Sequence, residues 1–340
     1  MDAYLRAIAT HLPARVVTNE QLQAENPGWD IAKIAAKTGI EHRHIAHDSE
    51  TAGDLAFVAG CKLLENSGIN RQSIDYLLFC TQSPDYYLPA TSCVLQHRLK
   101  LPTSCAAIDI NQGCSGYVYG LDMARALIIS GSARNVLLLT GETYSKYIHP
   151  RDRSVRVLFG DAASASLISA DGPGAKIGSA CLGTDGAGAS NLIVPAGGAR
   201  TPMGDKYPEE TVDEHGCVRT AANLYMNGQE LFSFTLHRVP ELVRNTLAKN
   251  NLTVDQVKWF VFHQANAFMN KHLQSKLKID VSRIPAFLKY VGNTVSNTIP
   301  LTIMNCHQQF SSGDNVMLIG FGVGYSWGAS VLSWEPIISA

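Results

Sequence analysis

The chain has 340 residues, of which 46% are hydrophobic, and a formal net charge of −1 at pH 7. This length fits two domains or one duplicated fold, and the near-neutral charge excludes a protein whose whole surface binds nucleic acid. No apolar run approaches the ~18 residues of a membrane-spanning helix, and residues 1–6 lack the features of a signal peptide. We therefore expect a soluble cytoplasmic protein with no membrane or nucleic-acid partner.

Short apolar runs alternate with longer, helix-like patterns along the chain. The sequence predicts strands over 4–9, 75–81, 105–110, 135–140, 162–169, 176–182, 258–263, 284–290, 315–320 and 328–334. It predicts helices over 19–25, 30–38, 52–67, 91–99, 115–131, 227–250, 267–277 and 298–310. Strands that are separated by helices pair in parallel and carry the helices on the faces of their sheet. The pattern therefore predicts an α/β fold.

Two pairs of segments resemble one another at a similar spacing. Residues 74–80 resemble 257–263, and 135–139 resemble 315–319. The first members lie 61 residues apart and the second members 58 apart (135 − 74 and 315 − 257). This near-equal spacing favours two duplicated halves, although apolar strands also match by chance.

The junction between the halves is expected around 170–220. We place an N-terminal half at 1–172, a connecting region at 173–223 and a C-terminal half at 224–340. The stretch 183–223 is rich in Gly, Pro and polar residues and is predicted to form an irregular surface insertion. Long loops of this kind often cover a binding site.

Cys114 is the strongest candidate for a catalytic residue. Residues 108–121 read Ile-Asp-Ile-Asn-Gln-Gly-Cys-Ser-Gly-Tyr-Val-Tyr-Gly-Leu, which is a short strand, a tight turn and the start of an apolar helix. A cysteine in this turn has its sulfur at a helix N-terminus, where the helix dipole favours the thiolate. Most of the other seven cysteines lie in apolar patterns and are expected to be structural, and no zinc-site spacing occurs.

Two later residues fit a site built around a thiolate. His263 follows the apolar run Phe-Val-Phe at the expected end of a strand, and Asn293 lies in Val-Gly-Asn-Thr, just past predicted strand 284–290. An imidazole and a carboxamide together can donate two hydrogen bonds to a carbonyl oxygen on which negative charge develops. A strand-end His and a turn Asn are also common structural residues, so this grouping is a hypothesis. The order Cys, His, Asn also occurs in papain-like hydrolases, but their motif Cys-Gly-Ser-Cys-Trp is absent.

Two further segments are candidates for ligand binding. The glycine-rich run 320–328 lacks a dinucleotide fingerprint and indicates either backbone amides near a ligand or a tight bend between strands. The segment His42-Arg43-His44 contains no carboxylate or cysteine that would complete a metal site, so a solvated surface stretch is the preferred interpretation.

Together these motifs resemble the β-ketoacyl-acyl-carrier-protein synthase III family of the thiolase fold. The resemblance rests on Thr-Gly-Ile-Glu-His-Arg-His-Ile (38–45), the Cys114 turn, Leu-Phe-Gly-Asp-Ala-Ala (158–163), His-Gln-Ala-Asn (263–266) and Gly-Asn-Thr (292–294). It implies two duplicated βαβαβ-type halves in a layered α-β-α-β-α core.

The resemblance also implies roles for individual residues. Cys114 would be the acylated nucleophile, and His263 and Asn293 would bind the malonyl thioester and promote decarboxylation. The backbone amide of Val323 would complete an oxyanion hole with that of Cys114. Leu88, Arg153, Asn266 and Phe268 are the further substrate-binding candidates. Acyl carrier protein and acyl-CoA or acyl-ACP would be partners, the protein would be a homodimer, and no cofactor or metal is implied.

The sequence departs from the family pattern at the substrate entrance. Lys33 replaces a tryptophan that stacks on coenzyme A, and Phe268 replaces a basic residue that meets the carrier protein. Leu88 replaces a phenylalanine of the acyl pocket, which indicates a longer or bulkier acyl group, whereas Arg153 keeps a basic position near the entrance. We expect decarboxylative condensation of a Cys-bound acyl group with malonyl-ACP, in fatty-acid initiation or a specialised pathway.

Two alternatives remain open. The first is an acyltransferase on the same scaffold that passes the acyl group to an alcohol or amine. The second is a non-catalytic subunit, which the intact Cys, His and Asn disfavour.

Overall fold

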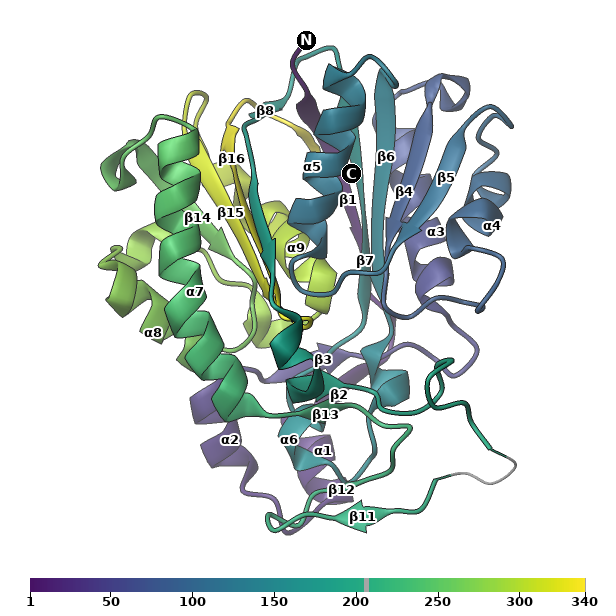
Figure 1. Cartoon of the computed structure of the whole chain (residues 1–340), viewed down its shortest axis with the longest axis vertical. Coiled ribbons are helices and arrows are strands. Elements are labelled where there is room, and N and C mark those ends of the chain that lie inside the picture. The colour runs from purple at the N-terminus through teal and green to yellow at the C-terminus, as the bar shows by residue number, and fades with distance from the viewer. Residues whose placement is uncertain (205–207, 340) are drawn as a thin grey trace.

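The computed structural model describes residues 1–204 and 208–339 and contains one large sheet with helices around it (Figure 1). The strands of this sheet are β1 (Tyr4–His11), β4 (Tyr76–Cys80), β5 (Ala106–Ile110), β6 (Asn135–Glu142), β7 (Ala162–Ser169), β8 (Ala175–Ile177), β9 (Cys181–Thr184), β14 (Val257–Phe262), β15 (Asn315–Gly322), β16 (Ser326–Ser333) and β17 (Ile338–Ser339).

The shorter strands form small pairs outside this sheet. They are β2 (Val16–Thr18) with β3 (His42–His44), β10 (Leu192–Ile193) with β13 (Tyr225–Met226), and β11 (Thr211–Val212) with β12 (Val218–Arg219). The α-helices are α1 (Asn19–Glu25), α2 (Ile31–Thr38), α3 (Ala52–Asn66), α4 (Thr91–Arg98), α5 (Gly116–Ile129), α6 (Arg153–Arg156), α7 (Gly228–Lys249), α8 (Ala267–Leu277) and α9 (Thr298–Cys306).

The strand order repeats in the two halves of the sheet. The main order is β14-β15-β16-β8-β1-β7-β6-β4-β5. In each half, two parallel strands (β4 with β6, β14 with β15) are followed by an antiparallel neighbour (β7, β16). The segments that echo one another in the sequence are therefore equivalent strands. The duplicated α/β architecture is confirmed, while the boundaries at 172 and 223 stay a prediction.

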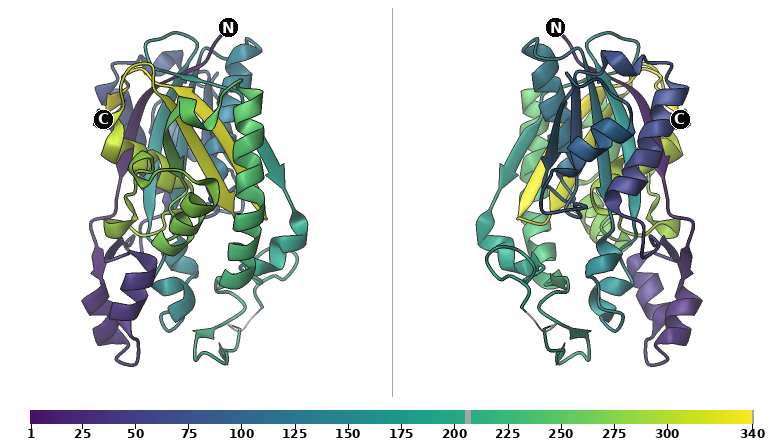
Figure 2. Two further views of the ribbon diagram at one scale, coloured as in Figure 1. Left: turned by 90° about the vertical axis from the view of Figure 1, so that its left-hand side faces the viewer. Right: turned by 90° about the vertical axis from the view of Figure 1, so that its right-hand side faces the viewer.

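The buried side chains show five layers, α-β-α-β-α. Helices α5 and α9 share one core cluster with strands of both halves, and they form the middle layer. Helix α3 packs with the N-terminal strands in a second cluster, and α7 and α8 pack with the C-terminal strands in another. The two side views show the same arrangement of helices on either side of the strands (Figure 2). Two covered sheet faces explain why the strands read as nearly continuous apolar runs.

A smaller cap covers one end of this core. Helices α1, α2 and α6 and the hairpin β11–β12 gather below the sheet (Figures 1 and 2). Part of the segment 183–223, predicted to be irregular, forms β10 and this hairpin. Residues 205–207 of that predicted loop lie outside the described residues.

Three predicted elements differ from the structure. Segment 284–290 is not a strand: the 3-10 helix Val281–Arg283 precedes it and the 3-10 helix Leu288–Tyr290 ends it, since Pro285 has no N–H for a strand ladder. Predicted strand 176–182 divides into β8 and β9 around Gly178, whose N–H donates to Val331. Predicted helix 298–310 ends as α9 at Cys306.

Candidate active site

Cys114 lies in the turn between β5 and α5, as the sequence predicts. The residue is 4% exposed. The end of β15 approaches it so closely that a Cβ on Gly322 would lie 2.9 Å from both the Cβ and the Sγ of Cys114. A side chain at position 322 would thus displace the sulfur, so the glycine allows the backbone to approach.

The protonation state of Cys114 differs from the sequence-based expectation. Burial is the largest effect and raises the pKa of its thiol to about 12, and nearby Glu142 acts in the same direction. The backbone N–H groups of Val323 and Cys114 face the sulfur and oppose this rise in pKa. The helix-end argument predicted a thiolate, but removal of the sulfur from water outweighs it. The free protein therefore holds a neutral thiol.

The glycine-rich run 320–328 fits both predictions made for it, a tight bend between strands and backbone amides that face a ligand site. Strand β15 ends at Gly322 and the antiparallel β16 begins at Ser326, so residues 323–325 form a tight bend. The N–H of Val323 in this bend faces the sulfur of Cys114.

His263 directly follows β14 and is 1% exposed. Burial lowers the pKa of its imidazole to about 3, so the ring is neutral at pH 7. Its Nδ1 lies 2.7 Å from the hydroxyl of Thr298, and this hydroxyl also lies 3.1 Å from the carbonyl oxygen of Val295. A hydroxyl can donate one hydrogen and also accept, so Thr298 can support either neutral tautomer of the ring.

Asn293 is positioned by a loop and not by the strand that the sequence predicted. Its N–H donates to Leu158 (2.8 Å), and its carbonyl oxygen accepts from Gly160 (3.0 Å). Its side-chain Oδ1 accepts from the N–H of Val295 at 2.9 Å. This bond fixes the orientation of the carboxamide, and its Nδ2 group remains as a donor for a ligand. Asn293 is 5% exposed.

The three residues line one inner cavity of about 80 Å³. The rest of its wall is largely apolar and includes Leu158, Phe159, Leu192, Met226, Leu231 and Phe321. Asn266, the N-cap of α8, lines the same cavity, and its Oδ1 accepts from Met269 at 2.8 Å. The structure therefore brings together Cys114, Asn293 and the pair His263 and Asn266 from three separate segments.

A larger cavity of about 920 Å³ connects this site with the surface. Asn266, Met269, Leu158, Met226 and Gly228 line both cavities, so the two are contiguous. The outer cavity is bordered by α2, the start of α7, α8 and the hairpin β11–β12 of the cap. This passage gives an extended substrate arm a route to the sulfur.

Phe268 lies at the mouth of this passage and is 39% exposed. Its ring centroid is 5.4 Å from that of Phe232 and 4.2 Å from that of His272. The Nζ of Lys37 lies 5.3 Å from the Phe268 centroid. An aromatic patch with one cation therefore occupies the place where the resemblance implies a basic residue.

Arg153 and Leu88 lie outside the two connected cavities. Arg153 lines a neighbouring surface hollow with Trp29, and its Nη2 donates to the carbonyl oxygen of His215 at 3.4 Å. Leu88 is 83% exposed. The substrate-binding roles of both residues stay predictions.

The hairpin β11–β12 is fixed to the cap by a charged network. Arg219 contacts the carboxylates of Asp152 at 2.7 Å and of Asp213 at 2.8 Å. The side chain of Asp152 is 1% exposed and also accepts from the N–H of Ser154 as the N-cap of α6. One wall of the mouth therefore depends on a buried ion pair.

The sequence did not single out four residues near the site. Glu142 is fully buried at the end of β6, Thr298 contacts His263, and Gln82 and Tyr144 lie beside the Cys114 turn. A glutamate in Thr-Gly-Glu-Thr reads as a loop residue, and the other contacts join positions far apart in the chain. No local pattern reveals them.

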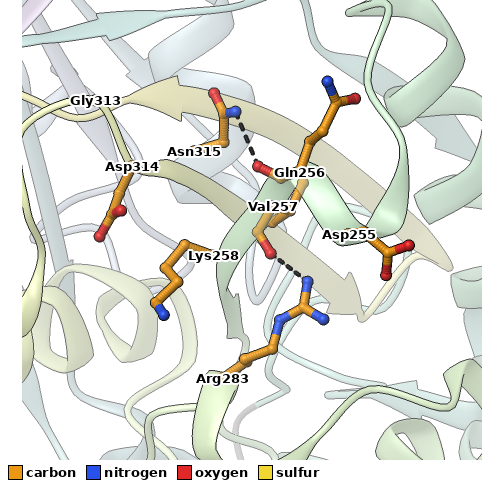
Figure 3. A pocket seen from close by; sticks show the side chains of 8 residues that line it. All are labelled: Asp255, Gln256, Val257, Lys258, Arg283, Gly313, Asp314 and Asn315. Atoms are coloured by element: carbon orange, nitrogen blue, oxygen red, sulfur yellow. Dashed lines mark hydrogen bonds between the residues drawn. The ribbon is translucent and has the colours of Figure 1, made fainter.

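A polar hollow elsewhere is distinct from this site (Figure 3). It lies at the starts of β14 and β15, at the opposite strand ends from Cys114 and His263. Its side chains mainly secure the backbone: Asn315 Nδ2 donates to the carbonyl of Gln256 at 3.0 Å, and Arg283 donates to that of Val257. Within residues 1–204 and 208–339, no cluster of three or more His, Cys, Asp or Glu side chains could hold a metal.

The layered fold and the buried Cys, His and Asn define a condensing enzyme of the thiolase-fold class. A family model described as 3-oxoacyl-[acyl-carrier-protein] synthase III matches residues 108–186. A second model, described as the C-terminal part of the same enzyme, matches residues 247–334. A β-ketoacyl-[acyl-carrier-protein] synthase III of Clostridioides difficile (strain 630) is 34% identical, over 98% of each chain. The chain therefore belongs to the β-ketoacyl-acyl-carrier-protein synthase III family, which the sequence motifs had predicted.

Other relatives support the same assignment. A putative 3-oxoacyl-[acyl-carrier-protein] synthase 3 of Campylobacter jejuni is 32% identical over 98% of this chain and 95% of that protein. A 2.1 Å crystal structure of a 3-oxoacyl-(acyl-carrier-protein) synthase III superposes with a TM-score of 0.95 at 46% identity, covering 98% and 100% of the two chains. The enzyme from Burkholderia xenovorans LB400 gives a TM-score of 0.91 at 38% identity, covering 100% and 97%. Among the described residues, no helix has the length and apolar character needed to cross a membrane.

Proposed function

We propose that this protein joins an acyl group on Cys114 to the malonyl group of malonyl-acyl carrier protein, with release of carbon dioxide. The observation that carries the proposal is the shared buried cavity of Cys114, His263 and Asn293, with its passage to the surface. The acyl group would come from acyl-CoA or acyl-ACP. The family assignment supports this reaction over transfer to an alcohol or amine.

In the first half-reaction, the sulfur of Cys114 attacks the thioester carbonyl of the donor. Burial keeps thiol and imidazole neutral, so the thiol proton leaves as the new C–S bond forms, and His263 is the base that accepts it. The N–H groups of Cys114 and Val323 stabilise the oxyanion. The donor C–S bond then breaks, and the leaving thiolate takes the proton from His263.

In the second half-reaction, the malonyl thioester enters by the same passage. Its carbonyl oxygen accepts hydrogen bonds from Asn293 Nδ2 and His263 Nε2. The carboxylate leaves as carbon dioxide, its bonding electrons form an enolate, and the enolate carbon attacks the acyl carbonyl. The C–C bond forms, the C–S bond to Cys114 breaks, and the sulfur takes up one proton from solvent, which replaces the negative charge of the carboxylate lost as carbon dioxide.

Thr298 acts as a positioning residue in this scheme. During acylation it accepts from Nδ1–H of His263 and donates to Val295, which leaves Nε2 free to take a proton. Between the half-reactions the ring gives up its Nδ1 proton and takes one at Nε2 by exchange with water, so that during decarboxylation Thr298 donates to Nδ1 and Nε2 carries the hydrogen. Thr298→Val removes both arrangements and should slow decarboxylation by roughly 10-fold or more. Its pH profile for decarboxylation should also change, whereas an effect on folding alone would leave that profile unaltered.

The first experiment is intact-protein mass spectrometry after exposure to a panel of acyl-CoA and acyl-ACP donors, with Cys114→Ala as the control. Malonyl-ACP is then added to any adduct. An adduct that requires Cys114 and disappears as a β-ketoacyl product forms supports condensation. An adduct that persists with malonyl-ACP refutes it and favours the acyltransferase alternative. Turnover by Cys114→Ala would show that this cysteine is not the nucleophile.

His263→Ala and Asn293→Ala separate the two half-reactions. Asn293 donates only to the malonyl carbonyl in this scheme, so Asn293→Ala should slow decarboxylation while acylation of Cys114 stays within roughly 3-fold of wild type. His263→Ala should slow both steps, and decarboxylation more strongly. Equal losses in both steps for Asn293→Ala would refute its assigned role.

The proposal includes a homodimer, on the basis of the family resemblance. Tyr86, Tyr87 and Leu88 are 59%, 88% and 83% exposed, and Ile108 on the edge strand β5 is 47% exposed. An exposed apolar loop beside an open sheet edge is suited to pairing with a second copy. Light scattering after size exclusion tests this state, and Leu88→Asp should weaken it. A cytoplasmic location is proposed from the sequence alone.

A further inference from the structure

Two polar side chains, Gln82 and Tyr144, lie beside the Cys114 turn and line neither of the two connected cavities. A Cβ on Gly113, the residue before the nucleophile, would lie 2.5 Å from Oε1 of Gln82 and would also meet Val323. The Gln82 amide therefore packs directly on the nucleophile turn. Tyr144 is 4% exposed and contacts this amide through its hydroxyl group.

Gln82 is held in a fixed orientation by several hydrogen bonds. Its Oε1 accepts from the hydroxyl of Tyr144 at 2.5 Å, and its Nε2 donates to Oδ1 of Asn111 at 3.2 Å. Its N–H donates to the carboxyl group of Glu142, and its carbonyl accepts from Tyr147 at 3.2 Å. Because Oε1 is already used by Tyr144, the amide presents its NH2 group as the remaining donor. One hydrogen of Nε2 is left over after the bond to Asn111.

The ring of Tyr144 connects these polar side chains with the apolar cavity. Its centroid lies 5.3 Å from that of Phe159, which lines the cavity containing Cys114 and His263. The Tyr144 ring therefore packs on Phe159 of the apolar cavity wall, and its hydroxyl group binds the Gln82 amide.

The order of events assigns the passage and these polar side chains to different substrates. In the proposed function, on which this inference rests, the malonyl arm must reach Cys114 while the acyl group is still attached. The passage past Asn266 and Met269 is then occupied by the malonyl arm. The acyl group must extend from the sulfur in the other direction, toward Gln82 and Tyr144.

We propose that Gln82, oriented by Tyr144, selects a short acyl group that carries a hydroxyl. The hydroxyl oxygen accepts the free hydrogen of Gln82 Nε2. A plain alkyl group would cover this donor without a hydrogen bond, and a site built to bond a substrate hydroxyl discriminates strongly against the analogue that lacks it. We expect acylation by the hydroxylated donor to be faster by roughly 10-fold or more.

The experiment compares donors that differ only in the hydroxyl. Pantetheine thioesters of butyrate, 3-hydroxybutyrate and 4-hydroxybutyrate are reacted with the full-length protein, and the initial rate of Cys114 acylation is followed by intact mass. Acetyl and octanoyl thioesters serve as general donors. The variants are Gln82→Leu, Tyr144→Phe and the control Gln72→Leu, whose side chain lies on the surface. The melting temperature of each variant is recorded beside its rate.

The expected result is a preference for at least one hydroxylated donor that Gln82→Leu abolishes and Gln72→Leu retains. Tyr144→Phe keeps the buried ring and should reduce the preference by releasing the amide. An equal or faster rate with butyrate in the wild type overturns the inference and leaves the condensing function standing. A preference that survives in a folded Gln82→Leu or Tyr144→Phe variant also overturns it. Absence of a Cys114 adduct with every donor would instead refute the proposed function.

Discussion

Glu142 allows a quantitative test of the electrostatics around Cys114. Its side chain is fully buried, and its oxygens accept from the N–H of Gln82 and lie 3.2 Å from the hydroxyls of Ser83 and Ser296. Burial raises the pKa of this carboxyl group to about 8, so it is protonated at pH 7. Glu142→Gln keeps the shape and an acceptor oxygen but cannot ionise.

The direction of the pH effect follows from proton binding. The folded state holds a proton on Glu142 up to about pH 8, whereas the unfolded chain releases it near the ordinary glutamate pKa of 4.5. The folded state therefore binds more protons over this interval, and the free energy of unfolding falls as the pH rises through it. Integrated between about pH 6.5 and about pH 8, this loss amounts to roughly 1.5 kcal/mol. Other shifted groups also contribute, such as His263, whose ordinary pKa of 6.5 lies at the edge of this interval, but they are common to wild type and variant and cancel in the comparison.

The assay is urea unfolding of wild type and Glu142→Gln at the two pH values. The wild type should lose roughly 1.5 kcal/mol more than the variant between them, and the surface control Glu65→Gln should follow the wild type. The same substitution should lower the pKa of Cys114, because the carboxylate that opposes its thiolate is removed. Alkylation of Cys114 by iodoacetamide above about pH 8 should therefore be faster in the variant. Parallel stability curves for wild type and Glu142→Gln would refute the raised pKa of Glu142.

Two further predictions concern the shape of the site and its mouth. Gly322→Ala should slow acylation of Cys114 by roughly 10-fold or more, measured by intact mass, because the added Cβ meets the sulfur at 2.9 Å. The control is Gly186→Ala, whose added Cβ meets no atom within 4 Å. Equal acylation rates in the two variants would contradict the close approach. Arg219→Leu should lower the free energy of unfolding by roughly 3 kcal/mol, because Asp152 keeps a buried charge without its partner. A decrease below about 1 kcal/mol, measured by urea unfolding, would show that the ion pair contributes little to stability.

The parts of the site that could be predicted from sequence are those carried by local patterns. The Cys114 turn joins a strand to a helix within a few residues, and His263 follows an apolar strand directly, so both lie where their local sequence places them. Their meeting follows from the duplicated sheet, whose equivalent strands were visible as the echo between 74–80 and 257–263. The placement of Asn293 after a strand was wrong, because its position depends on bonds to Leu158 and Gly160 and not on local periodicity.

The protonation state of the Cys114 thiol could not be predicted from its neighbours in sequence. The turn alone indicates a thiolate at a helix end, whereas the structure surrounds the sulfur with protein from β15 and with the carboxyl group of Glu142. The same holds for Gln82 and Tyr144, which are 62 positions apart and meet only in the folded chain. Local sequence specifies which groups are reactive, but their pKa values depend on long-range burial.

The unequal polarity of the groups around Cys114 offers a reason for the order of the reaction. The apolar cavity excludes water from the point where carbon dioxide leaves, which protects an enolate from protonation. A neutral thiol is a weak nucleophile in such an environment, so in the proposed scheme the acylation step needs His263 as a base. If the acyl group lies beside Gln82 and Tyr144, as we propose, these side chains bind its substituent without adding charge next to the enolate. An uncharged amide there is therefore compatible with decarboxylation, whereas a carboxylate at position 82 would repel the enolate, and Gln82→Glu should slow condensation more than it slows acylation.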